Sequence, residues 1–340
     1  MSEIEFGLDT FGGVTPGVDG APLHHAQVIR DLVEDGVVAD RLGLDFFAVG
    51  EHHRPDFAVS SPEMVLSAIA ARTERIRLGS AVTVLSSDDP VRVFERFATL
   101  DAVSGGRAEI VAGRGSFIES FPLFGYDLRD YEVLFEERLE LLAALLREEP
   151  VTWSGSTRAS LTDQRVYPET ERGLRAWVGV GGSPESVVRT ARYGLGLFLA
   201  IIGGPAARFA PYIELFEQAQ EEFGVERRPI AIHSPGLIAE TDDDARALVR
   251  DGWFAMRRRM GSERGWPPPS AGDFEREIET GALYVGSPET VARKIAGTLK
   301  TLPVNRFDLK YDQPVTHADQ RRSIELYGEK VVPLVKDMLA

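Results

Sequence analysis

Residues 176–187 read AWVGVGGSPESV, and this stretch joins a predicted buried strand directly to a predicted helix. The strand, residues 176–180, is short and apolar, as is typical of strands covered on both faces. Ser183 is a good N-cap residue, and Pro184 suits the first position of a helix. The glycines before Ser183 let a ligand approach the backbone, where free N–H groups and the helix dipole favour a phosphate. Ser183 and Ser186 can add hydroxyl donors to such a site.

The same alternation of short apolar runs and longer amphipathic segments extends over the whole chain. Eight strands, each followed by a helix and without a second composition regime, predict an α/β protein with one domain over residues 1–340. We interpret it as a single (β/α)₈ TIM barrel, and an open doubly wound sheet is the structural alternative. The predicted strands are residues 4–9, 45–49, 76–85, 108–112, 176–180, 197–202, 230–232 and 307–311.

Two insertions interrupt this alternation. Residues 151–167 predict a small surface β-hairpin, with strands at 151–153 and 165–167 and a turn at Ser154–Gly155–Ser156. Residues 252–281 contain several glycines and the run Pro267–Pro268–Pro269, which predicts a long irregular connection. Such a segment is either a lid over the site or a solvated surface loop, and both interpretations stay open.

Composition excludes several classes of function. The chain has no cysteine, which rules out disulfides, thiolate zinc sites, cysteine nucleophiles and iron–sulfur clusters. Its formal net charge of −15 argues against nucleic acid or an anionic membrane as the main partner. We see no signal-peptide pattern and no apolar run that approaches about 18 residues. We therefore expect a cytoplasmic protein without a membrane span.

The second predicted strand ends in a cluster of ionisable residues, Glu51, His52, His53 and Arg54. In a parallel barrel the active site forms at the carboxyl ends of the strands. Because neighbouring strand residues point to opposite faces, one histidine is expected to face the mouth, where it can exchange protons near neutral pH. The alternative is a pair of hydrogen-bonded structural histidines. Adjacent residues converge poorly on one ion, so no metal site is expected.

Two further strand ends and a second helix start carry signals of different specificity. Gly113–Arg114–Gly115 follows the fourth strand, and its guanidinium suits a phosphate, although a surface arginine between turn glycines is the alternative. The third strand ends in the small residues of Gly79–Ser80–Ala81–Val82, which leave room for a flat ring. Gly286–Ser287–Pro288–Glu289 repeats the pattern of the helix start at Ser183, so that pattern alone is not specific.

Taken in order along the chain, these landmarks resemble the bacterial luciferase-like, flavin-dependent oxidoreductase superfamily. The resemblance covers nearly the whole length and depends on the order of the landmarks rather than on one motif. The segments that carry it are Glu51–His52–His53, Gly79–Ser80–Ala81–Val82, Ser104–Gly105–Gly106–Arg107, Gly113–Arg114–Gly115, Gly181–Gly182 and residues 285–289.

The resemblance implies a TIM barrel that binds reduced flavin mononucleotide (FMN), or a deazaflavin in one branch. By match of position, His52 is the expected catalytic residue. Arg114, Gly182, Ser183 and Ser186 are the expected phosphate contacts. The family's non-prolyl cis peptide under the flavin ring falls at Ala81–Val82, and its mobile loop falls at residues 252–281. Luciferases carry a cysteine near the flavin where this chain has Gly113, which favours the non-luminescent members.

We therefore expect a two-component monooxygenase that uses O₂, a small organic substrate and reduced FMN from a separate flavin reductase. No Gly-rich dinucleotide fingerprint follows the first strand, so tight nicotinamide binding is not expected. The alternatives are a deazaflavin-dependent dehydrogenase that transfers hydride, a non-catalytic flavin-binding protein, and a barrel that acts on sugar phosphates. The resemblance also implies a possible homodimer.

Overall fold

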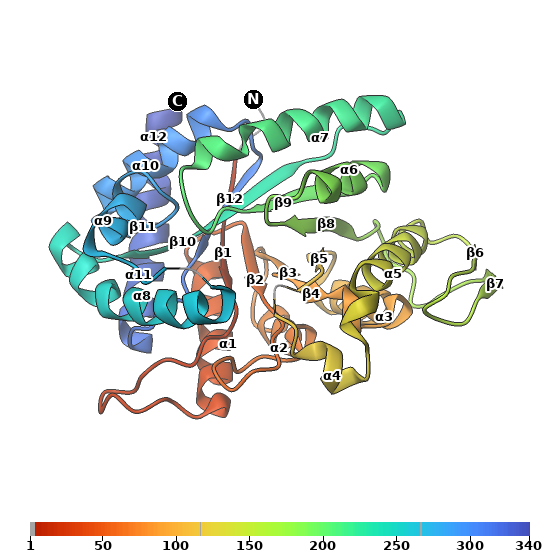
Figure 1. Ribbon diagram of the computed structural model, residues 1–340, viewed down its shortest axis with the longest axis horizontal. Helices are drawn as coiled ribbons and strands as arrows, with labels where there is room; N and C mark the ends of the chain where they lie inside the picture. The colour runs from red at the N-terminus through yellow and green to blue at the C-terminus, as the bar shows by residue number, and fades with distance from the viewer. Residues whose placement is uncertain (1–3, 116, 266) are drawn as a thin grey trace.

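A computed structural model describes residues 4–115, 117–265 and 267–340, and its centre is a closed barrel of parallel strands (Figure 1). Within those residues eight strands form the barrel, which confirms the predicted fold class. The ring closes because β10 pairs with both β9 and β12, and β12 pairs with β1. In order around the ring, the strands are β1 (Glu5–Thr10), β2 (Phe46–Val49), β3 (Arg77–Ser80), β5 (Ala108–Gly113), β8 (Arg175–Val180), β9 (Gly196–Ala200), β10 (Ile230–Ile238) and β12 (Arg306–Lys310).

The amino end of the barrel is filled by large side chains and ion pairs. Phe46, Trp177 and Phe198 are buried in one interior cluster. Beside them Arg306 is fully buried, with Nη1 2.8 Å from Oε2 of Glu109. Its guanidinium carbon also lies 4.0 Å from the ring centroid of Phe46. The remaining charged members of this network are Glu5, Arg77 and Arg175.

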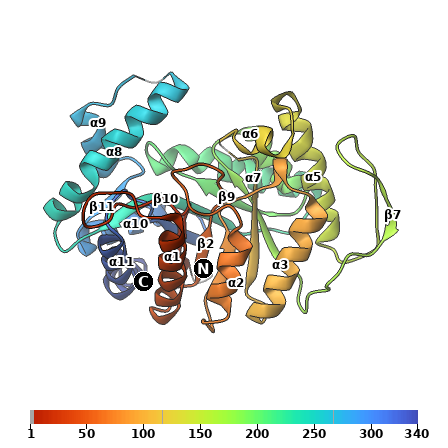
Figure 2. The ribbon, with the colours of Figure 1, turned by 90° about the horizontal axis from the view of Figure 1, so that it is seen from below.

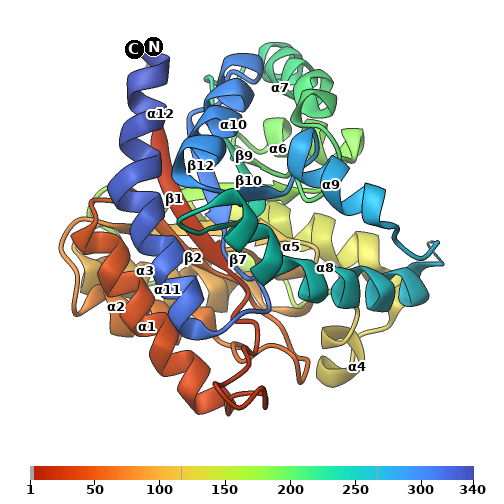
Figure 3. The same ribbon diagram turned by 90° about the vertical axis from the view of Figure 1, so that its left-hand side faces the viewer.

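Helices cover the outside of the barrel, against the strand side chains of opposite parity. Figure 2 shows α1, α2 and α3 side by side along one flank, and Figure 3 shows α11 and α12 next to β1. Across the described ranges no helix is both long and apolar enough to span a membrane. The helices are α1 (His25–Arg41), α2 (Pro62–Ala70), α3 (Pro90–Ser104), α4 (Ser120–Phe124), α5 (Tyr131–Leu145), α6 (Pro184–Arg192), α7 (Ala210–Phe223), α8 (Asp242–Arg264), α9 (Ala271–Glu279), α10 (Pro288–Thr301), α11 (His317–Leu326) and α12 (Val332–Leu339).

The third predicted strand is divided in two. Its first part is β3, and its second part is the short β4 (Thr83–Val84), which pairs with β5. The peptide bond between Ala81 and Val82 is cis, at the position that the family resemblance implies.

The predicted hairpin exists, but the position of its second strand was wrong. β6 (Val151–Trp153) pairs with β7 (Leu161–Gln164), not with residues 165–167. The cause is the Glu137 carboxylate on α5, which accepts hydrogen bonds from the backbone N–H groups of Ser156 and Thr157. These bonds fix the path of the connection, and the return strand begins at Leu161, four residues earlier than predicted.

The prediction of an irregular connection over residues 252–281 was wrong as well. Most of that segment is helical, in α8 and α9. Thr241 caps α8, and Ser270 and Asp273 form a capping box at the start of α9. Trp253 and Phe274 pack in a separate buried cluster that also includes residues of β10 and of β11 (Tyr284–Gly286). β11, which the sequence did not predict, pairs with the extended end of β10.

Candidate active site at the carboxyl end of the barrel

The predicted site residues follow four neighbouring strands, and the parallel barrel brings them to one rim. His52 follows β2, the Ala81–Val82 peptide follows β3, and Arg114 follows β5. Gly182 and Ser183 lie between β8 and α6. Ser186 lies in the first turn of α6 and is buried. In a parallel barrel this rim is where ligands bind.

His52 lies in an aromatic pocket at this rim. Its ring stacks on Phe57 with centroids 4.3 Å apart, and it meets Phe11 and Phe117 edge-on at 4.9 and 5.1 Å. Nδ1 lies 3.6 Å from Oε1 of Glu119. Burial raises the pKa of Glu119, but His52 and nearby backbone N–H groups lower that pKa more, so it lies below its usual value. The carboxylate therefore stays charged and orients the imidazole.

His53 has a structural partner instead. Its Nε2 lies 2.9 Å from Oε1 of Glu51, and the other oxygen of Glu51 accepts a hydrogen bond from the backbone N–H of Val84. The ring of His53 also meets Phe124 edge-on at 5.0 Å. Of the two histidines, His53 thus ties the β2 loop to β4, while His52 lies among the aromatic rings.

The floor beside the cis peptide is built from one valine and two glycines. A Cβ atom at Gly113 would lie 2.4 Å from Val82, and one at Gly179 would lie 2.8 Å from it. Both glycines are therefore required to seat the Val82 side chain across β5 and β8. Val82 and Gly179 are partly exposed, so this floor is open toward the rim.

Arg114 is linked to α6 through a carboxylate on α5. Its Nη1 lies 2.6 Å from Oε1 of Glu132, and the other oxygen of Glu132 lies 3.7 Å from Nη2 of Arg189 on α6. At the helix start, Ser183 Oγ accepts a hydrogen bond from the N–H of Ser186 and donates one to Glu185. The hydrogen bond from Ser183 is the main reason why the pKa of Glu185 is lowered, and the charges of Arg189 and Arg114 lower it further. Arg114 and Ser183 thus both lie close to the same carboxylate, that of Glu185.

The two Gly-Ser-Pro-Glu helix starts differ in what fills them. At α10 the carboxylate of Asp242 accepts a hydrogen bond from the N–H of Ser287 at 2.6 Å and one from the Thr290 hydroxyl at 3.0 Å. A partly buried structural partner therefore already occupies that helix terminus. At α6 the corresponding carboxylate is the fully exposed Glu185, and a Cβ atom at Gly181 would meet no atom within 4 Å. The start of α6 is the copy with room for an external anion.

Sequence reasoning missed a charged pair on the last strand. Lys310 Nζ lies 2.8 Å from Oδ2 of Asp312 and 4.1 Å from the ring centroid of Phe11. Asp312 also accepts hydrogen bonds from the Thr10 hydroxyl and the Phe11 N–H. The available signal was a lysine within the apolar strand Phe307–Tyr311, with the same parity as Arg306.

Three more polar side chains lie inside the barrel and were also missed. His233 Nδ1 lies 2.9 Å from Oδ2 of Asp9, and both side chains are almost fully buried. Both carboxyl oxygens of Asp308 are buried without a hydrogen-bond partner. Burial and the neighbouring carboxylates raise the pKa of Asp308 well above its usual value, although the Arg306 charge lowers it. Burial therefore favours the protonated form of this carboxyl.

Helix α8 reaches the loop that carries His52. Arg259 Nη2 lies 2.5 Å from Oδ2 of Asp56, and the guanidinium of Arg54 also contacts Asp56 at 3.2 Å. The Arg54 guanidinium carbon lies 4.5 Å from the ring centroid of Phe117, which borders His52. The segment predicted as a lid is thus joined to the site by an ion pair.

The sequence profile described as Luciferase-like monooxygenase matches residues 10–306, most of the chain. This chain belongs to the luciferase-like monooxygenase family. Among curated relatives of this family member, limonene 1,2-monooxygenase of Rhodococcus erythropolis is 29% identical, over 96% of this chain and 87% of the relative. N-acetyl-S-alkylcysteine monooxygenase of Bacillus subtilis is also 29% identical, over 90% of this chain and 93% of that protein.

Solved structures place this family member's fold beside both FMN and F420 enzymes. Monooxygenase RslO1 of Streptomyces bottropensis has a TM-score of 0.82 at 23% identity, over 97% of this chain and 99% of RslO1. The oxygenating constituent of 3,6-diketocamphane monooxygenase of Pseudomonas putida, in complex with FMN, has a TM-score of 0.77 at 20% identity, over 98% and 99%. The coenzyme F420-dependent tetrahydromethanopterin reductase of Methanopyrus kandleri has a TM-score of 0.73 at 20% identity, over 98% and 99%.

Proposed function

We propose that this protein is the oxygenating component of a two-component monooxygenase that uses reduced FMN, O₂ and a small organic substrate. The proposal rests on family membership and, above all, on one observation at the rim. Arg114 and Ser183, the N-cap of α6, both lie close to the Glu185 carboxylate, and Glu132 links Arg114 to α6. A flavin reductase would supply the reduced cofactor. When bound, the reduced flavin would supply the electrons that activate O₂.

The donors at this rim fit a phosphate ester. The Arg114 guanidinium can form paired hydrogen bonds to phosphate oxygens. The backbone at Gly182 and Ser183 and the hydroxyl of Ser186 lie at a helix terminus, which favours an anion. Glu132 and Glu185 occupy these donors in the structure, and both are solvent-exposed and able to rotate away.

The apolar floor fits a flat ring. Ala81 and Val82 lie between the phosphate donors and His52 along the ring of strands, and Gly113 and Gly179 keep the floor low. The phenyl rings of Phe57 and Phe117 exclude water around His52. Such an enclosure strengthens electrostatic interactions and suppresses side reactions with water. The substrate that these walls accept is small and largely apolar.

His52 is the residue that we assign to proton transfer. Glu119 faces Nδ1, so Nε2 is the nitrogen that exchanges a proton with the ligand. Histidine is the side chain that most often serves as general acid or base in enzymes. His53 is not assigned this role because Glu51 already engages its Nε2.

Anaerobic titration with reduced FMN, oxidised FMN and F420 tests the proposal. We expect reduced FMN to bind, and Arg114→Ala to weaken its binding about tenfold or more, since a hydrogen-bonded charge pair contributes about 1.5–3 kcal/mol. Arg129→Ala is the matched control, because Arg129 is an exposed arginine paired only locally with Asp127. Binding of F420 in preference to FMN would support the hydride-transfer alternative. Binding of neither cofactor would refute the proposal.

A further inference from the structure

Lys310 faces the inside of the barrel mouth. Along β12 the side chains of Arg306 and Asp308 lie inside the barrel, and Lys310 has the same parity. The intervening residues Phe307 and Leu309 pack in the core cluster between the barrel and its helices. The Phe11 ring, which lies 4.1 Å from Nζ of Lys310, lies 4.9 Å from the ring of His52. Lys310 and His52 thus border the same phenyl ring.

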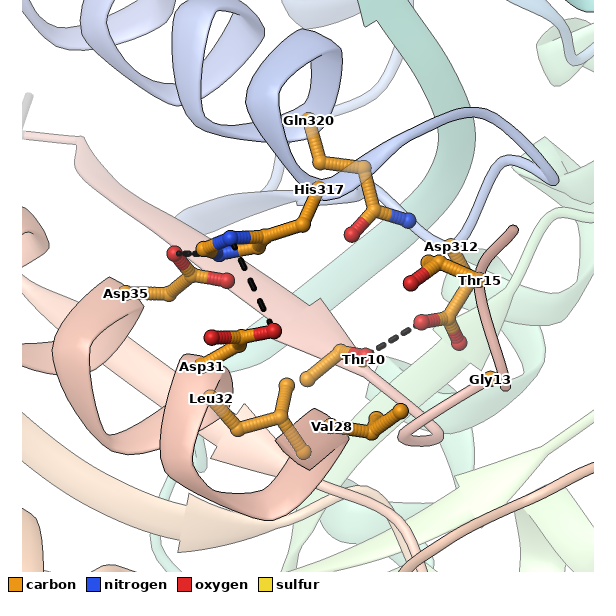
Figure 4. Close-up of a pocket in the computed structure, with 10 residues that line it drawn as sticks. All are labelled: Thr10, Gly13, Thr15, Val28, Asp31, Leu32, Asp35, Asp312, His317 and Gln320. Atoms are coloured by element: carbon orange, nitrogen blue, oxygen red, sulfur yellow. Dashed lines mark hydrogen bonds and ion pairs between the residues drawn. The ribbon is translucent and has the colours of Figure 1, made fainter. Parts of the chain in front are cut away.

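The ion pair of Lys310 has a defined direction. Its partner, the Asp312 carboxylate, is held by the Thr10 hydroxyl and the Phe11 N–H. Behind Asp312 is a cavity of about 10 Å³, lined also by Thr10 and, from α1 and α11, by Asp31 and His317 (Figure 4). The carboxylate therefore lies on the outer side of the pair, and the ammonium group lies on the side of Phe11 and His52. The positive end of the pair is directed toward the mouth.

The position of Lys310 relative to Arg114 follows from the order of the strands. Around the closed ring, β12, β1, β2, β3 and β5 succeed one another, so β12 lies four strands from β5. In a ring of eight, four strands is the opposite wall. A molecule held by its phosphate at Arg114 and extending across the mouth therefore has Lys310 on the wall opposite its anchor.

Among the described residues inside the barrel, the ionisable groups nearest Lys310 along β1 and β12 are carboxyl groups. Asp9, its neighbour on β1, is paired with His233. Asp308, one step deeper on the same strand, has a pKa that burial and its carboxylate neighbours raise well above the usual value, although the charge of Arg306 lowers it. Asp312 is the countercharge already described.

We propose that Lys310, positioned by Asp312, is the cation that faces the bound flavin from the wall opposite its phosphate and makes the site prefer reduced over oxidised flavin. This inference rests on the proposed function. Two-electron reduction gives the flavin ring a negative charge when N1 is deprotonated, whereas the oxidised ring is neutral. A nearby ammonium group in a water-poor site stabilises the charged form selectively.

The test compares dissociation constants of dithionite-reduced and oxidised FMN, measured anaerobically. We expect Lys310→Met to reduce the preference for the reduced form about tenfold, equivalent to about 30 mV in a two-electron midpoint potential. Lys310→Gln, measured in parallel, should give the same change. Lys310→Arg, which keeps the charge, should retain the preference within about threefold.

Lys300→Met is the matched control, because Lys300 is an exposed lysine on α10 and its loss changes the net charge equally. If folded Lys310→Met and Lys310→Gln bind both forms of FMN with the wild-type ratio, the inference is overturned while the proposed function stands. If the wild-type protein binds no flavin, the proposed function itself has failed.

Discussion

Glu132 is a competitor for the phosphate donors, so its removal should improve FMN binding. Its carboxylate lies 2.6 Å from Arg114 and 3.7 Å from Arg189, and a bound phosphate must replace it or tolerate its charge. The Glu132 side chain is 65% exposed, and exposed ion pairs contribute at most about 1 kcal/mol. Glu132→Gln should therefore tighten binding of FMN by up to about fivefold.

Fluorescence titration with FMN and with riboflavin, which lacks the phosphate, provides the assay. The gain should appear for FMN only, and it should diminish as salt screens the charges. Glu95→Gln serves as control, since Glu95 is paired with Arg92 on α3. Weaker binding of FMN by Glu132→Gln, or an equal gain for riboflavin, would contradict the assignment of Arg114 to the phosphate.

Three further outcomes follow from other parts of the structure. His52→Ala should lower turnover at least about tenfold while FMN affinity stays within about twofold, as steady-state rates and titration can check. Gly113→Ala should cost about 1–3 kcal/mol in denaturant unfolding, because its Cβ would lie 2.4 Å from Val82. Glu109→Gln should destabilise the fold by about 3–5 kcal/mol, because it removes the buried carboxylate that pairs with Arg306, Arg77 and Arg175. Burial raises the pKa of Glu109, but Arg306 and the other guanidinium groups lower it further, so the folded value lies well below 4.5. The contribution of a group with a depressed pKa is complete above its unfolded value and is lost as the pH falls. The stability difference between wild type and Glu109→Gln should therefore be constant above about pH 5 and narrow below about pH 4.5; a difference that instead grows on acidification would contradict this assignment.

The barrel strands could be predicted because short apolar runs of this composition fit few other kinds of secondary structure. Runs such as residues 108–112 are buried on both faces and bounded by turn residues, so burial alone identifies them. The return strand of the hairpin could not be placed, because Glu137 on a different element decides where the connection ends. β11 has three residues and owes its pairing to the length of β10, which no local pattern indicates.

The candidate site shows the same division between local and long-range information. The capped start of α6 is local, and the sequence predicted it together with Arg114. That Glu132 bridges Arg114 to α6, and that Asp242 fills the second Gly-Ser-Pro-Glu copy, depends on tertiary contacts. The inward direction of Lys310 was available from strand parity, but only once the bounds of β12 and the direction of Arg306 are known.

The ion pairs around Arg306 have a kinetic consequence. They seal one end of the barrel, so molecules can enter and leave the interior only by the rim. Because both reactants use the same entrance, the reactant that binds deeper must bind first and dissociate last. Steady-state kinetics should then show a compulsory order of addition. If the cofactor binds deeper, bound substrate should slow dissociation of the cofactor.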